Sequence, residues 1–481
     1  MTVWNYTLIS VLLLYLLMVV ATVITVIQER RDPVKALSWI ALVALLPVAG
    51  LIIFLFFGQD YRKRKIFNRK EIKDLRQIDE LSDKQVRQLG EIEIEEVVKH
   101  GNIIKLLLNN SKTLLTLGNK ITILNNGKET FDSIIDEIEK AESSIHLEYY
   151  IIEDDELGNR IADILVRKAQ AGVEVRLIYD DVGSWGLPRK FIRRLRDAGV
   201  KTYCFMPVVF PWFSSKINYR NHRKILVVDG KVGFTGGLNI ADRYIRGTKH
   251  GIWRDTHLRL EGEAVHMLQI AFLTDWYFSS KEPVRNRKKY LPPVESTDGP
   301  AAIQIALSGP DSDWATIMQA YFSAITGAQK HIYISTPYFL PNESILCALK
   351  VAALSGVDVR IMLPERSDSK MVHWASRSYF AELLEAKIKI YLYIKGFNHS
   401  KLIMIDGTFG SVGTANMDVR SFEDNFEITA MIYDRKYTGE LEEQFMRDLA
   451  GCRRITMRKW LSRKHKDNFI ESVARLFSPM L

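Results

Sequence analysis

The chain has little cysteine and no cysteine framework. Cys204, Cys347 and Cys452 are the three cysteines among 481 residues, and long stretches of sequence separate them. A structural zinc site needs closely spaced cysteines or histidines, and a secreted disulfide scaffold needs an even, dense set of cysteines. The sequence therefore predicts neither, and the scarcity of cysteine suits a reducing cytoplasm.

Acidic residues are fewer than basic ones. The sequence has 66 Lys and Arg against 57 Asp and Glu, a formal net charge of +9. At 47% hydrophobic residues, it can also bury more than one core. This balance favours an anionic partner, either nucleic acid or an anionic membrane surface.

Two runs near the N-terminus have almost no charge. Residues 4–27 and 36–58 are strongly apolar, and QERRDPVK separates them. Each run is long enough to cross a bilayer, which takes about 20 apolar residues, so residues 1–60 predict a two-helix transmembrane hairpin. The first run has no basic leader and a second run follows it, so we expect no cleaved signal peptide. Pro47 and Gly50 are expected to kink the second span.

The charges that flank the two spans predict their orientation. DYRKRKIFNRK, residues 60–70, follows the second span, whereas the basic residues of the connecting loop are partly offset by Glu29 and Asp32. Cytoplasmic flanks carry the excess of Lys and Arg. The chain is therefore predicted to be a multi-pass protein of the cell membrane, with everything after residue 60 in the cytoplasm.

The remainder of the chain contains an internal duplication. A strand, a helix and a strand are predicted over residues 145–180, and the same order returns over residues 331–364. AGVEVRLIYD and SGVDVRIMLP, which close the two passes, lie 184 residues apart. The pattern predicts two similar α/β sandwich halves with mainly parallel sheets.

Changes in composition predict the domain boundaries, and a segment rich in proline and charge separates the halves. The predicted order is the hairpin at 1–60, a basic juxtamembrane linker at 61–115, the first half at 116–285, a linker at 286–300, the second half at 301–450 and a basic amphipathic C-terminal segment at 451–481.

One pattern occurs twice, once in each half. The copies are His222-x-Lys224-x4-Asp229 and His399-x-Lys401-x4-Asp406. A glycine-rich turn and an asparagine follow each copy, Asn239 after the first and Asn416 after the second, and the two histidines lie 177 residues apart. Chance does not explain such a repeat, so we expect one site at the interface of the halves, built from both.

The residue types of this pattern suit phosphodiester chemistry. One histidine can attack phosphorus while the other protonates the leaving oxygen. A lysine two residues after a histidine on a strand points to the same face, where its charge stabilises the phosphoryl group in the transition state. A histidine nucleophile forms a covalent phosphoenzyme. Because cationic side chains supply the electrostatics, no metal or other cofactor is expected.

These residues resemble the phospholipase D superfamily, whose signature is this duplicated motif, over roughly residues 120–450. The resemblance implies a phosphohistidine mechanism in which an acidic residue downstream of each motif orients a histidine ring, and Asp255 and Glu427 match those positions. Asp229 and Asp406 enter the candidate catalytic set as motif members, although the resemblance implies a structural role for them. The order of the histidines stays open, with His222 favoured as nucleophile and His399 as acid.

Four further stretches resemble the bacterial cardiolipin synthases within that superfamily. They are Arg31–Trp39, Phe56–Gly58, Gly413–Glu427 and Arg475–Pro479. The resemblance implies transfer of a phosphatidyl group between two phosphatidylglycerol molecules, which yields cardiolipin and glycerol. The partners are then phosphatidylglycerol and cardiolipin in an anionic membrane and no nucleic acid, while the oligomeric state is open.

Three alternatives remain at this point. A phospholipase D would use water as the acceptor, a membrane-tethered nuclease would use nucleic acid, and a non-catalytic protein would only bind anionic lipid. The last is disfavoured because both motifs are complete. Pocket-lining roles are predicted for Thr235, Ser411, Asp418 and Arg420.

Two other segments have both a structural and a membrane interpretation. PVVFPWF, residues 207–213, is either a buried loop or a loop that dips into lipid. The basic C-terminal segment is either a helix packed on the domain or an amphipathic helix at the lipid interface.

Overall fold

The computed structural model describes residues 3–28, 33–46, 48–57, 75–208, 218–249, 251–283, 287–294, 299 and 301–478. Most of the predicted lipid-dipping loop PVVFPWF lies outside the described residues. The chain divides into two compact units, one of residues 1–71 and 208–219 and one of residues 72–207 and 220–481.

Among its described residues, the first unit contains one helix long and apolar enough to cross a membrane. Helix α1 (Val3–Gln28) is unbroken, and its part Ile9–Gln28 has a mean hydropathy of 2.7. The predicted second span is not confirmed, because this run is divided into α2 (Pro33–Leu45) and α3 (Ala49–Phe57). Val48 lies between them with a φ of 64°, a left-handed conformation that interrupts a helix. The division lies next to Gly50, one of the two residues expected to kink this run, whereas Pro47, the other, lies outside the described residues.

Helices α2 and α3 pack against each other and α2 packs against α1. The Tyr15 hydroxyl donates a hydrogen bond to the Val43 carbonyl at 3.0 Å. Val43 and Phe54 are buried with Val26 in a small apolar cluster. Most other side chains of α1 are exposed, such as Leu17 at 66%. An exposed leucine-rich helix is stable in lipid, which needs no water-facing polar surface.

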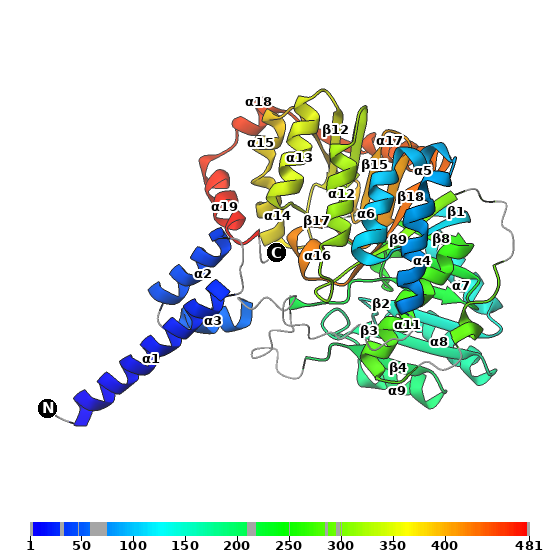
Figure 1. Cartoon of the computed structure of the whole chain (residues 1–481), viewed down its shortest axis with the longest axis horizontal. Helices are drawn as coiled ribbons and strands as arrows, with labels where there is room; N and C mark the ends of the chain where they lie inside the picture. Colours follow the sequence, from blue (N-terminus) through cyan, green and yellow to red (C-terminus); the bar gives the residue numbers. More distant parts are fainter. Residues whose placement is uncertain are drawn as a thin grey trace. The chain divides into compact units, whose positions relative to one another are not determined.

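The second unit is built on a mixed sheet of fifteen strands among the described residues (Figure 1). The first half contributes, in spatial order, β1 (Leu115–Asn125), β8 (Thr256–Glu261), β6 (Val232–Gly236), β5 (Ile225–Val228), β2 (Ser144–Tyr149), β3 (Glu174–Asp180) and β4 (Lys201–Phe205). The second half contributes β9 (Ala301–Ser308), β18 (Glu427–Tyr433), β16 (Phe409–Gly413), β15 (Leu402–Ile405), β10 (His331–Ser335), β12 (Asp358–Pro364), β13 (Lys389–Tyr393) and β19 (Cys452–Ile455).

The two halves repeat one topology, as the sequence predicted. Seven strands correspond in order, from β1 to β4 and from β9 to β13, and β1 joins the halves by pairing with both β8 and β9. The prediction of mainly parallel sheets is wrong. Only the βαβ strands β2, β3 and β4, and likewise β10, β12 and β13, are parallel within this sheet, because β-hairpins that follow each motif add antiparallel strands.

Helices cover both halves and enclose their cores. In the first half they are α7 (Asn126–Lys140), α8 (Glu156–Gln170), α9 (Arg189–Asp197) and α11 (Glu263–Ser280). In the second half they are α12 (Thr316–Thr326), α13 (Glu343–Leu354), α14 (Lys370–Arg377), α15 (Phe380–Glu385) and α17 (Arg435–Leu449), with α12 and α13 side by side (Figure 1). Helix α8 is an example of how these helices form and pack. Asp155 caps its N-terminus, and Leu157, Ile161 and Leu165 form a buried apolar stripe.

Part of the predicted juxtamembrane linker belongs to the core of the second half. Residues 75–111 form α4 (Leu75–Gln88), α5 (Glu95–Lys99) and α6 (Gly101–Ser111). Ile104 and Leu107 of α6 are fully buried in the cluster that also contains Ile317 of α12. The charge of residues 61–115 hid this apolar stripe, so the linker prediction is wrong for α6.

Candidate active site

Each motif segment is hydrogen-bonded to the backbone of the other half. The His222 N–H donates to the Phe426 carbonyl at 2.9 Å, and the His399 N–H donates to the Arg254 carbonyl at 2.7 Å. Next to these bonds, β14 (Gly396–Asn398) pairs with β7 (Ile252–Arg254), and Asn221 bridges to Phe426. The next residue after each accepting carbonyl is an acid, so the backbone pairing sets that acid against the motif histidine.

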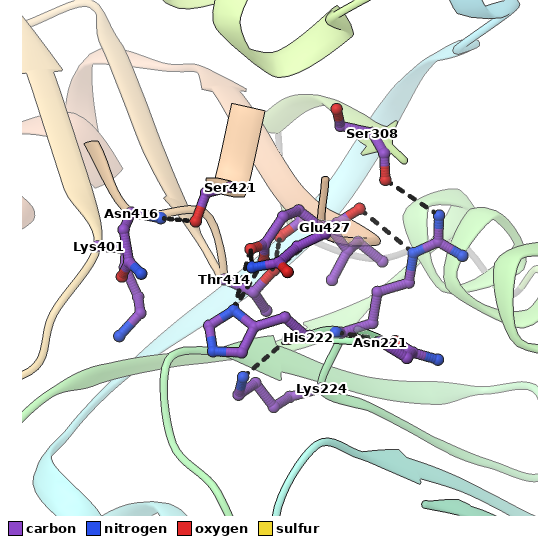
Figure 2. A network of polar contacts seen from close by, with 12 residues as sticks. Asn221, His222, Lys224, Ser308, Lys401, Thr414, Asn416, Ser421 and Glu427 are labelled. Atoms are coloured by element: carbon purple, nitrogen blue, oxygen red, sulfur yellow. Dashed lines mark hydrogen bonds and ion pairs between the residues drawn. The ribbon is translucent and has the colours of Figure 1, made fainter. Parts of the chain in front are cut away.

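The acid of each half therefore holds the histidine of the other. His222 Nδ1 lies 3.0 Å from Glu427 Oε2, and His399 Nδ1 lies 2.7 Å from Asp255 Oδ2. Figure 2 shows the His222 ring directed at Glu427, which also accepts a hydrogen bond from Thr414. An acid bound at Nδ1 fixes the tautomer and leaves Nε2 for chemistry.

Both histidines line one cavity of about 570 Å³. Tyr150 meets the His222 ring edge-on at 5.0 Å, and Tyr244 meets the His399 ring edge-on at 5.5 Å. The further lining residues are Ile151, Arg220, Asn239, Arg243, Thr248, Trp253, Tyr338, Asp368, Asn416, Asp418, Arg420 and Asn425. The cavity therefore combines aromatic walls with guanidinium groups and amides, a lining suited to an anion.

The two motif lysines are buried beside their histidines. Lys224 Nζ donates to the His222 carbonyl at 2.7 Å, and Lys401 Nζ donates to the His399 carbonyl at 2.6 Å. Figure 2 shows Lys224 next to His222, and Lys401 beside Asn416, both of the second half. Burial lowers the pKa of Lys224 well below its usual value and that of Lys401 to about 8. A bound phosphodiester would offset this desolvation, so both ammonium groups favour an anion here.

The two asparagines differ in how they are held. Asn239 donates to the Tyr244 hydroxyl at 2.7 Å and accepts from the Ile151 N–H at 3.2 Å. The buried Oδ1 of Asn416 has no hydrogen-bond partner within the described part of the chain. Buried amide groups are normally paired, so the Asn416 side chain has bonding capacity left for a ligand.

The four central titratable groups have shifted pKa values. Burial lowers the pKa of His222 to about 4 despite Glu427, and burial with Lys401 and Lys224 lowers that of His399 well below its usual value. Burial alone would raise the pKa of Glu427, but His222 and Lys224 bring it down to about 2. Burial raises the pKa of Asp255 to about 6, against the opposing effect of Lys401. Both imidazoles are consequently neutral at pH 7 in the protein alone.

The motif aspartates do not belong to the cavity. Asp229 accepts hydrogen bonds from the N–H groups of Glu142, Ser143 and Ser144 at 2.7–2.9 Å, and Asp406 accepts from those of Gln329, Lys330 and His331 at 2.7–2.9 Å. Each one follows β5 or β15, at the end away from the histidine. Their place in the candidate catalytic set is therefore corrected, because they fix the loops before β2 and β10.

The glycine after each motif is required by a close approach. A Cβ at Gly237 would lie 2.2 Å from Asp255 Oδ1, and a Cβ at Gly413 would lie 2.4 Å from Thr429 Oγ1. A side chain at Gly237 would displace Asp255 itself, and one at Gly413 would displace β18, which carries Glu427. The glycines of these turns thus leave the space in which the acid of each His–acid pair is held.

Of the four residues predicted to line the pocket, two do. Asp418 and Arg420 line the cavity. Thr235 on β6 and Ser411 on β16 are fully buried in the sheet, and Ser411 Oγ lies 3.2 Å from the Tyr321 hydroxyl. Alternation along a strand turns these two side chains away from the cavity.

Sequence reasoning missed Arg223, which lies between the histidine and lysine of the first motif. Its Nε donates to the Glu427 carbonyl at 3.3 Å and one NH2 donates to the Ser308 carbonyl at 3.4 Å, while Asp275 neutralises its charge. Arg223 is almost fully buried and ties the first motif to the second half. A charged residue within a buried motif was the available signal, although the second motif has Ser400 there.

Comparisons with known proteins show the family to which the chain belongs. The family model described as "Cardiolipin synthase, PLD-like domain" matches residues 134–263 and 321–449, and "Phospholipase D-nuclease N-terminal" matches residues 16–59. The chain is 44% identical over 460 residues to the cardiolipin synthase of Alkalihalophilus pseudofirmus, covering 95% of this chain and 91% of that one. It is 39% identical to the cardiolipin synthase of Oceanobacillus iheyensis, covering 98% of both chains.

A solved structure supports the fold alone. The phosphatidylserine synthase of Haemophilus influenzae superimposes with a TM-score of 0.59 at 15% identity, over 79% of this chain and 98% of that one. The two matched segments of the family model lie one in each half, so the predicted duplication is confirmed.

Proposed function

Because the chain belongs to the cardiolipin synthase family of phospholipase D-like proteins, we propose that it transfers a phosphatidyl group from one phosphatidylglycerol to another, giving cardiolipin and glycerol. The observation that carries the proposal is that His222 and His399, each with an acid from the other half at Nδ1, line one cavity. Two histidines of this kind suit a double displacement at phosphorus.

In the first step His222 attacks. Its Nε2 forms a bond to the phosphorus of the first phosphatidylglycerol, and the bond from phosphorus to the glycerol oxygen breaks. His399, protonated in the complex, gives its proton to that oxygen, so glycerol leaves and a phosphatidyl-histidine remains. The firmly ionised Glu427, with its pKa of about 2, supports His222 as the nucleophile, because it stabilises the positive charge that the ring acquires.

In the second step His399 acts as the base. It takes the proton from the terminal hydroxyl of a second phosphatidylglycerol, whose oxygen attacks phosphorus and displaces His222. Lys224, Lys401 and the amides of Asn239 and Asn416 would hold the phosphoryl oxygens through both steps. The product is cardiolipin, and His399 again carries the proton that it held at the start of the first step.

The acceptor brings a second phosphate into the same cavity. Arg243 and Arg420 each follow a site asparagine by four residues and both line the cavity. We assign them to the acceptor's phosphate, because a guanidinium binds phosphate oxygens with two parallel hydrogen bonds. On this assignment Arg420→Gln should lower kcat/KM for phosphatidylglycerol as acceptor, mainly by raising its KM. It should lower kcat/KM for a simple alcohol as acceptor less, because an alcohol has no phosphate.

We also infer that α1 crosses the membrane, that α2 and α3 embed beside it, and that the second unit is cytoplasmic. The apolar length of α1 and the basic segment 60–70 support this placement. Cys347 is exposed on the second unit, so an impermeant maleimide should label it in inside-out vesicles and not in right-side-out ones.

Product analysis tests the proposed function. Purified full-length protein in vesicles of headgroup-labelled phosphatidylglycerol should give cardiolipin and labelled glycerol in equal amounts. Phosphatidic acid in place of cardiolipin would show that water is the acceptor. His399→Ala is the matched control, since it should form neither product at a comparable rate.

A further inference from the structure

The last long helix of the chain has its polar and apolar faces reversed. Helix α18 (Met457–Leu461) and helix α19 (His465–Arg475) follow β19, and α19 packs on α14 (Figure 1). The side of α19 that faces the domain carries Glu471, only 3% exposed, whose Oε1 pairs with Arg377 at 3.3 Å and Arg463 at 2.5 Å. Helices of soluble domains normally bury their apolar side and not an ion pair.

The opposite side of α19 is apolar and exposed. Phe469, Val473 and Leu476 are 71%, 40% and 77% exposed. Their spacing of four and three residues places them in one stripe, opposite Glu471 and Ala474. Leu461 and Phe477 extend the exposed apolar surface at 72% and 42%. A stripe of this kind is unfavourable in water and needs an apolar environment.

Exposed basic residues precede the stripe in the sequence. Arg458, Lys459, Lys464 and Lys466 are all exposed on or between α18 and α19. Trp460 anchors this segment to the domain, with its ring 4.9 Å from that of Phe380 and the Arg377 guanidinium 5.0 Å from its centre. Exposed apolar side chains that follow exposed basic residues match an anionic bilayer, where the apolar side chains enter the acyl boundary and the cations face lipid phosphates.

The surface also lies close to the cavity. Asp368 lines the cavity, and α14 begins two residues later at Lys370. Helix α19 packs directly on α14, so a single helix separates the exposed stripe from a cavity-lining residue.

We propose that α18 and α19 form a lipid-docking element that inserts Phe469, Val473 and Leu476 into the interface of an anionic bilayer and holds the cavity at the lipid surface. The packed-helix and lipid-helix interpretations of the C-terminal segment are then both correct, one for each side of α19. The docking itself does not depend on the proposed function, whereas its effect on turnover does.

A fluorescent label tests the docking in the full-length protein. A chain with Cys347→Ser and Val473→Cys carries an NBD label and is reconstituted into phosphatidylglycerol vesicles. Doxyl-labelled lipid should quench the label and aqueous iodide should not, whereas a label at Lys190→Cys, on the exposed side of α9, should behave in the opposite way. Quenching by iodide overturns the proposal, and so does shielding from both quenchers, which would mean that protein covers the stripe.

Turnover provides the second readout. Phe469→Glu places a carboxylate in the stripe, and Ser472→Glu places the same charge on a polar position of the same helix. Phe469→Glu should lower turnover in phosphatidylglycerol vesicles roughly fivefold or more, and Ser472→Glu should lower it less. Both should retain turnover on a short-chain, monomeric phosphatidylglycerol. Equal loss on both substrates overturns the docking role, whereas no cardiolipin from the unaltered protein overturns the proposed function and leaves the quenching result intact.

Discussion

His399 of the second half and Asp255 of the first half meet across the interface, with Nδ1 and Oδ2 2.7 Å apart. The same relationship joins His222 to Glu427 in the opposite direction. Each half alone therefore contains a histidine without its acid and an acid without its histidine. The site therefore forms only when the two halves pack against each other, because each His–acid pair takes one residue from each half.

Replacing the acids should remove activity without unfolding the protein. In Glu427→Gln, the amide no longer compensates a positive charge on His222 or fixes its tautomer, so kcat should fall roughly a thousandfold or more. Asp255→Asn should act similarly through His399. The double variant should be little worse than either single one, because the two pairs serve one reaction. Steady-state kinetics measure kcat for the single and double variants, and circular dichroism is the folding control. Losses of kcat that multiply in the double variant would contradict the prediction.

Anion binding should be accompanied by proton uptake. In the protein alone the pKa of His222 is about 4 and that of His399 is well below its usual value, so neither ring holds a proton at pH 7. A phosphodiester analogue adds negative charge beside them and raises both pKa values, so a proton should bind with it. Calorimetry of tungstate or a short-chain phosphonate in buffers of different ionisation enthalpy reports this uptake. A binding enthalpy independent of the buffer would contradict it.

The motif aspartates should affect stability and not chemistry. Asp229→Asn loses a charge that accepts three backbone hydrogen bonds, which should cost about 2–4 kcal/mol of stability. The folded variant should keep kcat within a few-fold of the unaltered protein below its melting temperature. Asp406→Asn provides the matched case in the second half. A thousandfold loss of kcat in a variant with normal thermal stability would return these residues to the catalytic set.

A buried histidine outside the site should make stability depend on pH. His146 is fully buried and stacks on Phe272, and burial lowers its pKa to about 3. Between pH 6.5 and about pH 3 the unfolded chain binds a proton at His146 that the folded chain does not bind. The stability of the folded protein therefore falls as pH falls through this range. Relative to His146→Leu, the unaltered protein should lose about 1.4 kcal/mol per pH unit in that range. Thermal midpoints of both proteins at pH 7, 6 and 5 test this, and a constant difference would contradict it.

The sequence predicted which residues form the candidate site but not which acid pairs with which histidine. Duplication alone predicted that His222 and His399 share one site, and the structure places both in the lining of one cavity. The crossing of Asp255 and Glu427 between halves could not be predicted, since it depends on how β7 and β14 pair in space. Spacing also could not show that Asp229 turns away from the cavity, because that depends on the loop whose amides it binds.

The fold, like the site, was predicted from the sequence only in part. The βαβ passes were visible as periodic segments, but the antiparallel hairpins after each motif were not, and they make the sheet mixed. Composition identified α1, and Pro47 and Gly50 predicted a kink in the second run, whereas the left-handed conformation of Val48 is a local backbone feature that hydropathy does not report. The reversed faces of α19 became clear only when the ion pairs of Glu471 with Arg377 and Arg463 were located.

The most direct test of the central claim is a single-turnover measurement with phosphatidyl-4-nitrophenol, whose leaving group departs without a proton donor. The account predicts that His399→Ala releases one equivalent of nitrophenolate and stops, with a phosphatidyl group on His222 by mass spectrometry, because the base for the second step is missing. His222→Ala should release none. A burst from His222→Ala, or an adduct on His399 in the unaltered protein, would contradict the account.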